Sequence, residues 1–424
     1  MSRALITLML CTFTIGTAES VIAGILPPIA HDTDVSLRAV GMLITLYALV
    51  VVVTGPLVTA LCGCLSRRTV LTSCMSVFAV GNLVCALSPG YAGLVTGRAV
   101  SALAHSTVIA VAVACARDLA PPHRKARATA QVTLGIGLAT VVGVPAGTAL
   151  GEQFGWRVTF ATLALLSVVS VPLLAFSRLP PTPPRREPAL AGRKRRPRPS
   201  FPPSMIATAA VIVCGTAGVF TLYTYAVPFL TQETGLAGAL TTWLLLLYGL
   251  GGIAGNTLGA RMADSSHQRA ALIALAVGTT GLLALAAARH NPLAAAALLT
   301  LTGLAYFATI PALNAQIVAD APRSDPAVAL AVNNSAFCVG IALGSWLGGT
   351  LITDRPLAVL PLAAAALTGL ALLIQWGITR TTRTQPARLA TTDGPSHPVP
   401  SNHAPRDIPA HQPDTAHDPT GLSR

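Results

Sequence analysis

The chain contains few charged residues. Only 10% of its 424 residues are charged, and 53% are hydrophobic. A soluble globular domain carries about 25% charged residues, so this composition excludes one and indicates a polytopic membrane protein. Apolar runs of roughly 20 residues, the length that crosses a bilayer, recur along the sequence. We predict twelve such spans, at about 5–29, 39–60, 69–88, 92–116, 128–150, 158–176, 205–228, 239–260, 270–288, 293–318, 327–351 and 357–377.

The sequence also contains none of the short motifs of soluble enzymes. It has no Gly-x-Ser-x-Gly, no His-Glu-x-x-His and no P-loop, and the missing P-loop argues against direct use of ATP. The eight cysteines show no metal-ligand spacing beyond Cys62-x-Cys64. With most of the chain in spans, there is no room for a soluble catalytic domain. We therefore expect no enzyme activity, no cofactor and no metal.

The basic residues are distributed unevenly along the chain. If the N-terminus is cytoplasmic and the spans alternate, 23 of the 28 basic residues lie inside and four lie outside. This asymmetry follows the positive-inside rule, which predicts a multi-pass protein of the inner or plasma membrane with both termini in the cytoplasm. The net charge of +13 then faces anionic lipid headgroups, and we expect no nucleic-acid partner.

Two segments between and after the spans differ in composition. Residues 177–203 are rich in Pro and Arg, which predicts a solvated cytoplasmic linker. Residues 379–424 are rich in Pro, Thr, Asp and His, which predicts a disordered cytoplasmic tail. The chain then divides into a six-helix half at 1–176, the linker at 177–203, a second six-helix half at 204–378 and the tail at 379–424.

Short repeats relate the two halves. Residues 16–19 read Gly-Thr-Ala-Glu and residues 215–218 read Gly-Thr-Ala-Gly. Glycines at spacing four recur in the fifth span and in the eleventh: Gly143, Gly147 and Gly151, then Gly340, Gly344 and Gly348. We predict an all-α membrane protein with twelve transmembrane helices in two six-helix pseudo-symmetric halves, an architecture that transporters build around a midplane site.

Glu19 lies within the first apolar span. A carboxylate at membrane depth is costly, and such residues usually face a cavity or a partner and mark an ion or substrate path. Its counterpart in the second half is Gly218, so packing at this helix position does not require a carboxylate. The sequence thus indicates a membrane transporter with one main protonatable acid.

Two further polar residues lie within the fourth span. At 1.5 Å per residue, Arg98 lies roughly 9 Å and Glu19 roughly 14 Å below the outer surface, depths that allow pairing or a water bridge. The alternative is that Arg98 snorkels to the interface. His105 follows seven residues later on the same helix face, either as a proton relay or as a hydrogen-bonded packing histidine.

Several stretches resemble the major facilitator superfamily, specifically its twelve-span drug:proton antiporter branch. Residues 16–27 are similar to the first-helix motif of bacterial chloramphenicol, sugar and purine efflux members, in which an acid occupies the position of Glu19. Residues 97–101 resemble the buried-arginine motif of the family. Gly143, Pro145 and Gly147 resemble its antiporter motif, although close helix packing and a proline bend also account for them.

The loop after the second span resembles the cytoplasmic gate motif of the same family. Arg67 and Arg68 match the basic pair, whereas Gly63 replaces the usual acid, and Asp264 keeps it in the second-half copy. The resemblance implies that the basic pair latches the inner gate with Asp118. The alternative is that the two arginines only signal topology.

Polar and aromatic residues within spans are candidates for a substrate cavity. Drug pockets are mostly apolar with a few polar groups, and for each residue ordinary interhelical packing is the alternative. The predicted cavity residues are Tyr47, Tyr223, Tyr225, Phe307, Asn333, Asn334 and Phe337.

The resemblance and the membrane acid together imply a proton-coupled exporter. We expect efflux of small, largely apolar organic compounds such as antibiotics, by alternating access, with protons, the small-molecule substrate and membrane lipids as partners of a monomer. The alternatives are a sugar or nucleoside efflux carrier, a uniporter, and a non-transporting membrane sensor. A sensor would need a folded signalling domain, which the tail does not supply.

Overall fold

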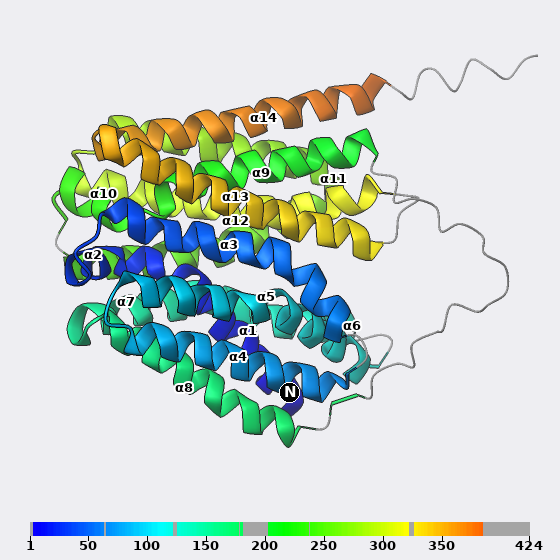
Figure 1. Ribbon diagram of the computed structural model, residues 1–424. Helices are drawn as coiled ribbons and strands as arrows, with labels where there is room; N and C mark the ends of the chain where they lie inside the picture. The colour runs from blue at the N-terminus through cyan, green and yellow to red at the C-terminus, as the bar shows by residue number, and fades with distance from the viewer. Residues whose placement is uncertain are drawn as a thin grey trace, which may run out of the picture. The chain divides into compact units, whose positions relative to one another are not determined.

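The computed structural model describes residues 3–62, 65–121, 125–177, 179–180, 202–236, 238–321 and 326–384, and all regular structure within them is helical (Figure 1). The first half contains α1 (Arg3–Ser20), α2 (Ile22–Asp32), α3 (Leu37–Leu61), α4 (Arg67–Leu87), α5 (Tyr91–Leu119), α6 (Lys125–Leu138), the π-helix η3 (Ala139–Gly143), α7 (Val144–Phe154) and α8 (Trp156–Ala175). The second contains α9 (Pro203–Tyr223), α10 (Ala226–Glu233), α11 (Gly238–Ala287), α12 (Pro292–Ala319), α13 (Pro326–Asp354), the 3-10 helix η4 (Leu357–Val359) and α14 (Leu360–Thr384).

The described helices supply twelve membrane spans. Ten are long and apolar enough to cross a bilayer, and α1 with α2 adds an eleventh as a bent pair. The span Leu240–Ala287 has 48 residues and a non-helical break at Ser266. Unbroken, it would be about 72 Å long, more than twice the hydrocarbon thickness of about 30 Å, so α11 forms two spans. The predicted fold class is confirmed, whereas most of the predicted linker and tail lies outside the described residues.

Three spans deviate from a straight α-helix. The bend between α1 and α2 is 50°. The seventh span is interrupted between α9 and α10 at Thr224 and Tyr225. In the fifth span the π-turn η3 precedes Pro145, whose ring nitrogen has no hydrogen to donate to the preceding turn, and the Val144 N–H bonds to the Ala139 oxygen five residues back. These deviations place irregular backbone in the membrane interior.

The two halves meet mainly along α3 and α13, which lie side by side in the middle of Figure 1. One apolar cluster runs through both halves, and a second lies within the second half alone. Large apolar side chains also cover the outside of the bundle, among them Val53, which is 71% exposed, and Trp243, which is 64% exposed. Lipid tails are as apolar as these side chains, so they are stable on a membrane-facing surface.

Candidate functional site

Glu19 lies directly before the bend in the first span. Helix α1 ends at Ser20 and α2 begins at Ile22, and the Val21 N–H still bonds to the Thr17 oxygen at 2.9 Å. Within α2, Ile25 has non-helical backbone angles, and Pro27 and Pro28 follow it. The far end of α2 is fixed to α8, because the Trp156 Nε1–H donates to Asp32 Oδ2 at 2.9 Å. The bend thus holds a half-buried carboxylate where the helix backbone is interrupted.

The glycines of the fifth span support this bend. Three glycines of this span, Gly143, Gly147 and Gly151, lie against the first span. A Cβ atom added to any of them would come within 3.0 Å of a side chain there, which real Cβ atoms essentially never do. The pairs are Gly143 with Thr17, Gly147 with Val21 and Gly151 with Ile25. Glycine therefore lets the fifth span lie directly on the turn before Glu19, on the bend and on the turn after it.

Arg98 of α5 is fully buried beside Glu19. Its Nη1 donates to the Ala18 oxygen at 2.7 Å, and its Cζ lies 3.9 Å from the centroid of the Tyr47 ring. The Nε and Nη2 atoms have no hydrogen-bond partner among the described residues. No ion pair shorter than 4 Å joins Glu19 and Arg98 in this part of the chain. Arg98 thus binds the backbone next to Glu19 instead of snorkelling to the interface.

His105, two turns further along α5, contacts Tyr47. Its Nδ1 lies 2.9 Å from the Tyr47 hydroxyl, and the two rings meet edge to face at a centroid distance of 5.5 Å. Which of the two atoms donates depends on the tautomer of the imidazole. Tyr47 therefore connects Arg98, above its ring, with His105, at its hydroxyl. Tyr47 is itself buried, with 1% of its surface exposed, and it belongs with Arg98 and His105 to the polar side chains near Glu19.

The second half contributes aromatic residues opposite Glu19. Glu19 lies within electrostatic range of Tyr223, Tyr306 and Cys338 of that half, and of Arg98 and His105 of its own half. Tyr223 stacks on Tyr248 with a centroid distance of 5.0 Å. A continuous chain of ring contacts defines an aromatic cluster made of Phe220, Tyr223, Tyr248, Tyr306 and Phe307. An acid thus lies near a cluster of aromatic rings with a few hydroxyls, a combination that suits an organic molecule with few polar groups.

Four other residues that we predicted for the cavity make contacts that ordinary packing accounts for, and their role in a cavity stays a prediction. Tyr225 is fully buried and packs between Gly41 of α3 and the α13 backbone, where its hydroxyl donates to the Ser345 oxygen at 3.2 Å. Its ring fills the gap between the two halves. Asn333 donates to Asn314 Oδ1 at 2.6 Å, Asn334 is exposed, and Phe337 packs against the second apolar cluster. A polar or aromatic residue type in a span does not reveal the direction in which its side chain points.

Two of the four predicted gate residues are in contact with each other. Arg67 Nη2 lies 2.6 Å from Asp118 Oδ2, at the ends of α4 and α5 that face the linker. Arg68 instead donates to the Ser177 oxygen at 2.9 Å. Asp264 is exposed, and no ion pair joins it to another described residue. The structure thus brings the first-half pair together and leaves the second-half acid at the surface.

The hydrogen bonds between the halves lie away from the linker. Thr45 donates to the Ala342 oxygen at 3.3 Å, and Thr242 donates to Glu152 Oε2 at 3.2 Å. Both hydrogen bonds join the first half to the second. Together with Tyr225, they close the bundle on the side where α2 ends and α3 begins.

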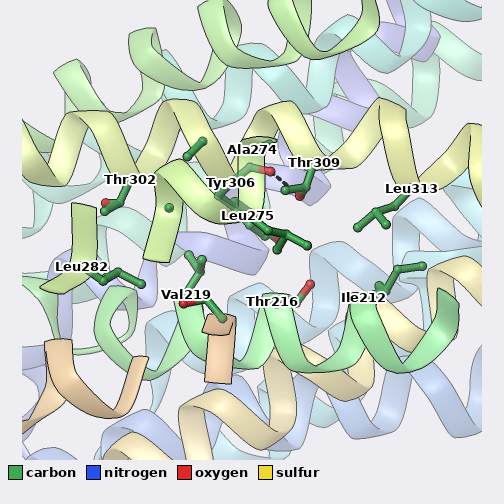
Figure 2. Close-up of a pocket in the computed structure, with 14 residues that line it drawn as sticks. Ile212, Thr216, Val219, Ala274, Leu275, Leu282, Thr302, Tyr306, Thr309 and Leu313 are labelled. Atoms are coloured by element: carbon green, nitrogen blue, oxygen red, sulfur yellow. Dashed lines mark hydrogen bonds between the residues drawn. The ribbon is translucent and has the colours of Figure 1, made fainter. Parts of the chain in front are cut away.

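A separate small cavity lies within the second half. Figure 2 shows it among α9, the second segment of α11, α12 and α14, with Thr216, Leu275 and Tyr306 on its wall. Its volume is about 20 Å³, which is room for about one water molecule. The lining is almost entirely apolar, and the Thr309 hydroxyl is already bonded to the Tyr306 oxygen at 2.6 Å. This cavity is too small for an organic substrate, so the aromatic cluster beside Glu19 is the better candidate.

Sequence reasoning missed Tyr248, Phe220 and Cys338. Tyr248 lies in an apolar span like the tyrosines that we selected, so the same signal was present. Phe220 lies three residues before Tyr223 on α9. Because residues three apart share a helix face, this spacing could have identified it.

Comparison with known proteins gives one consistent result. The family model described as Major Facilitator Superfamily matches residues 8–226 and 209–410. The inner membrane transport protein YdhP of Escherichia coli is 35% identical over 87% of this chain and 94% of its own. The chloramphenicol efflux pump Rv0191 of Mycobacterium tuberculosis is 33% identical over 84% of this chain and 87% of its own.

Solved structures agree on the fold. A bacterial homologue of the human lysosomal transporter Spinster, in an inward-facing and unoccupied conformation, covers 89% of this chain and 96% of its own with a TM-score of 0.69 and 16% identity. A D-xylose–proton symporter covers 88% of this chain and 97% of its own with a TM-score of 0.70 and 16% identity. At these identities the likeness establishes the fold alone.

Proposed function

The chain belongs to the Major Facilitator Superfamily, and within this family of multi-pass membrane transporters we propose that it exports small, largely apolar organic compounds in exchange for protons. The observation that carries this proposal is the position of Glu19. It lies at a bend of the first span, within electrostatic range of Tyr223 and Tyr306 of the other half. Every other acidic residue in the described helices lies in the last turn of a helix or beside the break at Ser266.

Coupling follows from competition at Glu19. Arg98 keeps two buried N–H groups without a partner, so a small rotation about the bend would let the ionised carboxylate accept from them. When Glu19 binds a proton, this attraction is lost and Arg98 keeps only the Ala18 oxygen. The protonation state therefore biases the bend of the first span, and a substrate seated against the aromatic cluster competes for the same space. His105 acts through Tyr47 in this scheme.

The substrate class follows from the aromatic cluster. Its rings offer apolar contact, and the hydroxyls of Tyr223 and Tyr306 offer a few hydrogen bonds. Two relatives are a chloramphenicol efflux pump of Mycobacterium tuberculosis and a chloramphenicol resistance protein of Streptomyces lividans. We propose antibiotic-like compounds of this kind as substrates.

The contacts between helix ends supply the gates. We propose that the Arg67–Asp118 pair fixes α4 to α5 on the cytoplasmic side while the halves open and close as units. Asp264 marks the equivalent loop of the second half without such a partner. The closed side at Tyr225 is then the external one, with both termini in the cytoplasm. The division into halves at 1–176 and 204–378, with a linker and a tail, belongs to this proposal.

Transport by purified protein in proteoliposomes tests the proposal. With an acidic interior, protons leave through an antiporter while external substrate enters, so labelled chloramphenicol should accumulate and should leak out when an ionophore removes the gradient. Glu19→Gln should equilibrate the compound without accumulating it, whereas Glu152→Gln should behave like wild type. Uptake that is independent of the pH gradient would contradict antiport, and transport of a sugar or nucleoside instead would favour the alternative carriers.

A further inference from the structure

Two asparagines on neighbouring spans of the second half bond to each other. Asn333 of α13 donates through Nδ2 to Asn314 Oδ1 of α12 at 2.6 Å. Asn333 is 7% exposed, and its Oδ1 is buried without a hydrogen-bond partner among the described residues. The large majority of buried side-chain acceptors in proteins are paired, because an unpaired one loses its bond to water without replacement. The Asn333 oxygen is therefore a candidate binding point for a donor on a ligand.

The asparagine pair lies beyond the aromatic cluster along both helices. Asn314 follows Phe307 by seven residues, close to two helical turns, so it shares the same face of α12 about 10 Å further along. Asn333 precedes Cys338 on α13 by five residues, or about 8 Å. Cys338 in turn lies within electrostatic range of Glu19. The pair is thus within one small molecule's length of the aromatic cluster and of the coupling acid.

The face of α12 that holds Asn314 becomes more exposed toward the linker. Asn314 is partly buried, and Val318, four residues further on, is 36% exposed. Asp320, directly after α12, accepts from Thr208 near the start of α9, so this end of α12 lies where the linker joins the second half. A molecule that approaches the aromatic cluster from the linker side therefore meets the asparagine pair first.

The chemistry of the pair selects an uncharged hydrogen-bonding group. An asparagine amide is neutral and has one acceptor oxygen and two N–H donors. A calcium or magnesium ion would need at least six oxygen ligands, usually with carboxylates among them, and no group of His, Cys, Asp or Glu in the described part of the chain could hold a metal. A hydroxyl suits the pair, because it donates to Asn333 Oδ1 and accepts from the amide N–H of Asn314.

We propose that Asn333 and Asn314 bind a hydroxyl group of the transported compound while its aromatic end contacts the aromatic cluster. The inference rests on the proposed export function and specifies its substrate class. The compound is neutral and has an aromatic ring and a hydroxyl that lie roughly 8–10 Å apart, the spacing along the two helices. An analogue without the hydroxyl is disfavoured, because it leaves the buried Asn333 oxygen unpaired. Chloramphenicol has an aromatic ring and hydroxyl groups, so it serves as the probe.

A thermodynamic cycle between residue and ligand tests the site. Calorimetry of purified protein, without a pH gradient, measures the binding of chloramphenicol and of two analogues in which fluorine replaces one or the other hydroxyl. Fluorine is close to a hydroxyl in size but donates no hydrogen bond. In wild type, one of the two replacements should weaken binding about ten-fold, whereas in Asn333→Leu it should weaken binding less than about two-fold. A merely structural asparagine would weaken the binding of all three compounds equally.

Two further variants complete the test. Asn82→Leu is the matched control, because Asn82 of α4 is also fully buried with an Oδ1 that lacks a hydrogen-bond partner within the described chain. It should leave the ten-fold difference unchanged. Asn314→Ala keeps Asn333 but removes the bond that orients it, so the difference should shrink, and this variant decides the matter if Asn333→Leu does not fold.

The outcomes separate this inference from the proposed function. Equal effects of the fluorine replacements in wild type and in Asn333→Leu would overturn the hydroxyl site and leave export of chloramphenicol standing. A ten-fold difference that disappears in Asn82→Leu as well would also overturn it, because the effect would then not be specific to the pair. No binding of chloramphenicol by wild type would contradict the proposed substrate class, and the inference with it.

Discussion

The two glycine series of this transporter meet their neighbours in different ways. In the first half, Gly147 faces the Val21 side chain, with a Cβ position 2.6 Å from its Cγ2 atom. In the second half, Gly344 faces the Ala217 backbone oxygen, and Gly348 faces the Thr221 oxygen in the same manner. Side chains can change rotamer, whereas a helix backbone can only move as a unit. The same sequence spacing thus places glycine against side chains beside Glu19 and against backbone oxygens in the other half.

The two halves also differ in the partners of the acids at the ends of their fourth spans. At the linker-facing end of its fourth span, the first half pairs Asp118 with Arg67. At the corresponding end of the second half, Asp320 accepts from the Thr208 hydroxyl at 2.6 Å. Thr208 also accepts from Gln316, which exchanges amide hydrogen bonds with Gln375 at 2.9 and 3.2 Å. We infer that the first half contains the groups that titrate and switch, while the second half supplies a fixed scaffold and the aromatic surface.

Substitution of the glycines should give the largest difference between the halves. Gly344→Ala forces a Cβ against a backbone oxygen, so α9 and α13 must separate, and we expect a loss of about 1–3 kcal/mol in stability. Gly147→Ala displaces the Val21 side chain, a smaller shift than the separation of two helices, and should cost less than Gly344→Ala. Thermal unfolding of the purified proteins measures both. Gly137, whose Cβ position has nothing within 4 Å, provides the control as Gly137→Ala. Equal losses of stability in Gly344→Ala and Gly147→Ala would contradict the difference between the two glycine series.

Replacement of Arg98 should have the next largest effect. Arg98→Gln removes the charge-assisted hydrogen bond to the Ala18 oxygen beside the bend, and a hydrogen bond of this kind contributes about 1.5–3 kcal/mol. We expect proton-driven accumulation to fall at least about ten-fold, because the bend no longer responds to Glu19. His105→Gln keeps a hydrogen-bonding group near Tyr47 and should retain most of the activity. If the histidine variant lost more activity than the arginine variant, the order of roles would be reversed.

The acids at the ends of the fourth spans should give the smallest effect. Asp118→Asn removes an ion pair that is partly exposed and worth about 0–1 kcal/mol, so transport should slow by at most about five-fold with normal expression. Asp320→Asn keeps an oxygen that accepts from Thr208, and it should change the rate less. Initial rates in proteoliposomes compare the two variants. A greater slowing in Asp320→Asn would assign the switching role to the second half.

Much of the fold could be predicted from the sequence because apolar length and charge asymmetry determine spans almost independently of packing. The resemblance of the chain to the Major Facilitator Superfamily was confirmed by the family model. Glu19 could be selected because a carboxylate in an apolar run is costly wherever its side chain points. These signals depend on composition and order along the chain, so a single sequence contains them.

The contacts of individual side chains could not be predicted in the same way. Arg98 and Glu19 have compatible depths, yet Arg98 donates to the Ala18 backbone oxygen, one residue before Glu19, and forms no ion pair with the carboxylate. Gly218, which we interpreted as a neutral counterpart of Glu19, is required by close packing, since a Cβ there would lie 2.6 Å from Thr368 Cγ2. Tyr225 fills the gap between the halves instead of lining a cavity. Each outcome depends on helix rotation and bending, which residue type does not encode.

Proton release on substrate binding tests the central claim most directly. Purified protein in weakly buffered detergent solution at fixed pH is mixed with chloramphenicol, and a pH indicator reports the protons released per transporter. If Glu19 is the coupling acid, wild type and Glu152→Gln should release protons equally, and Glu19→Gln should bind the compound without releasing any. Proton release from Glu19→Gln equal to that of wild type would contradict the account and would transfer the coupling role to another group, with His105 as the first candidate.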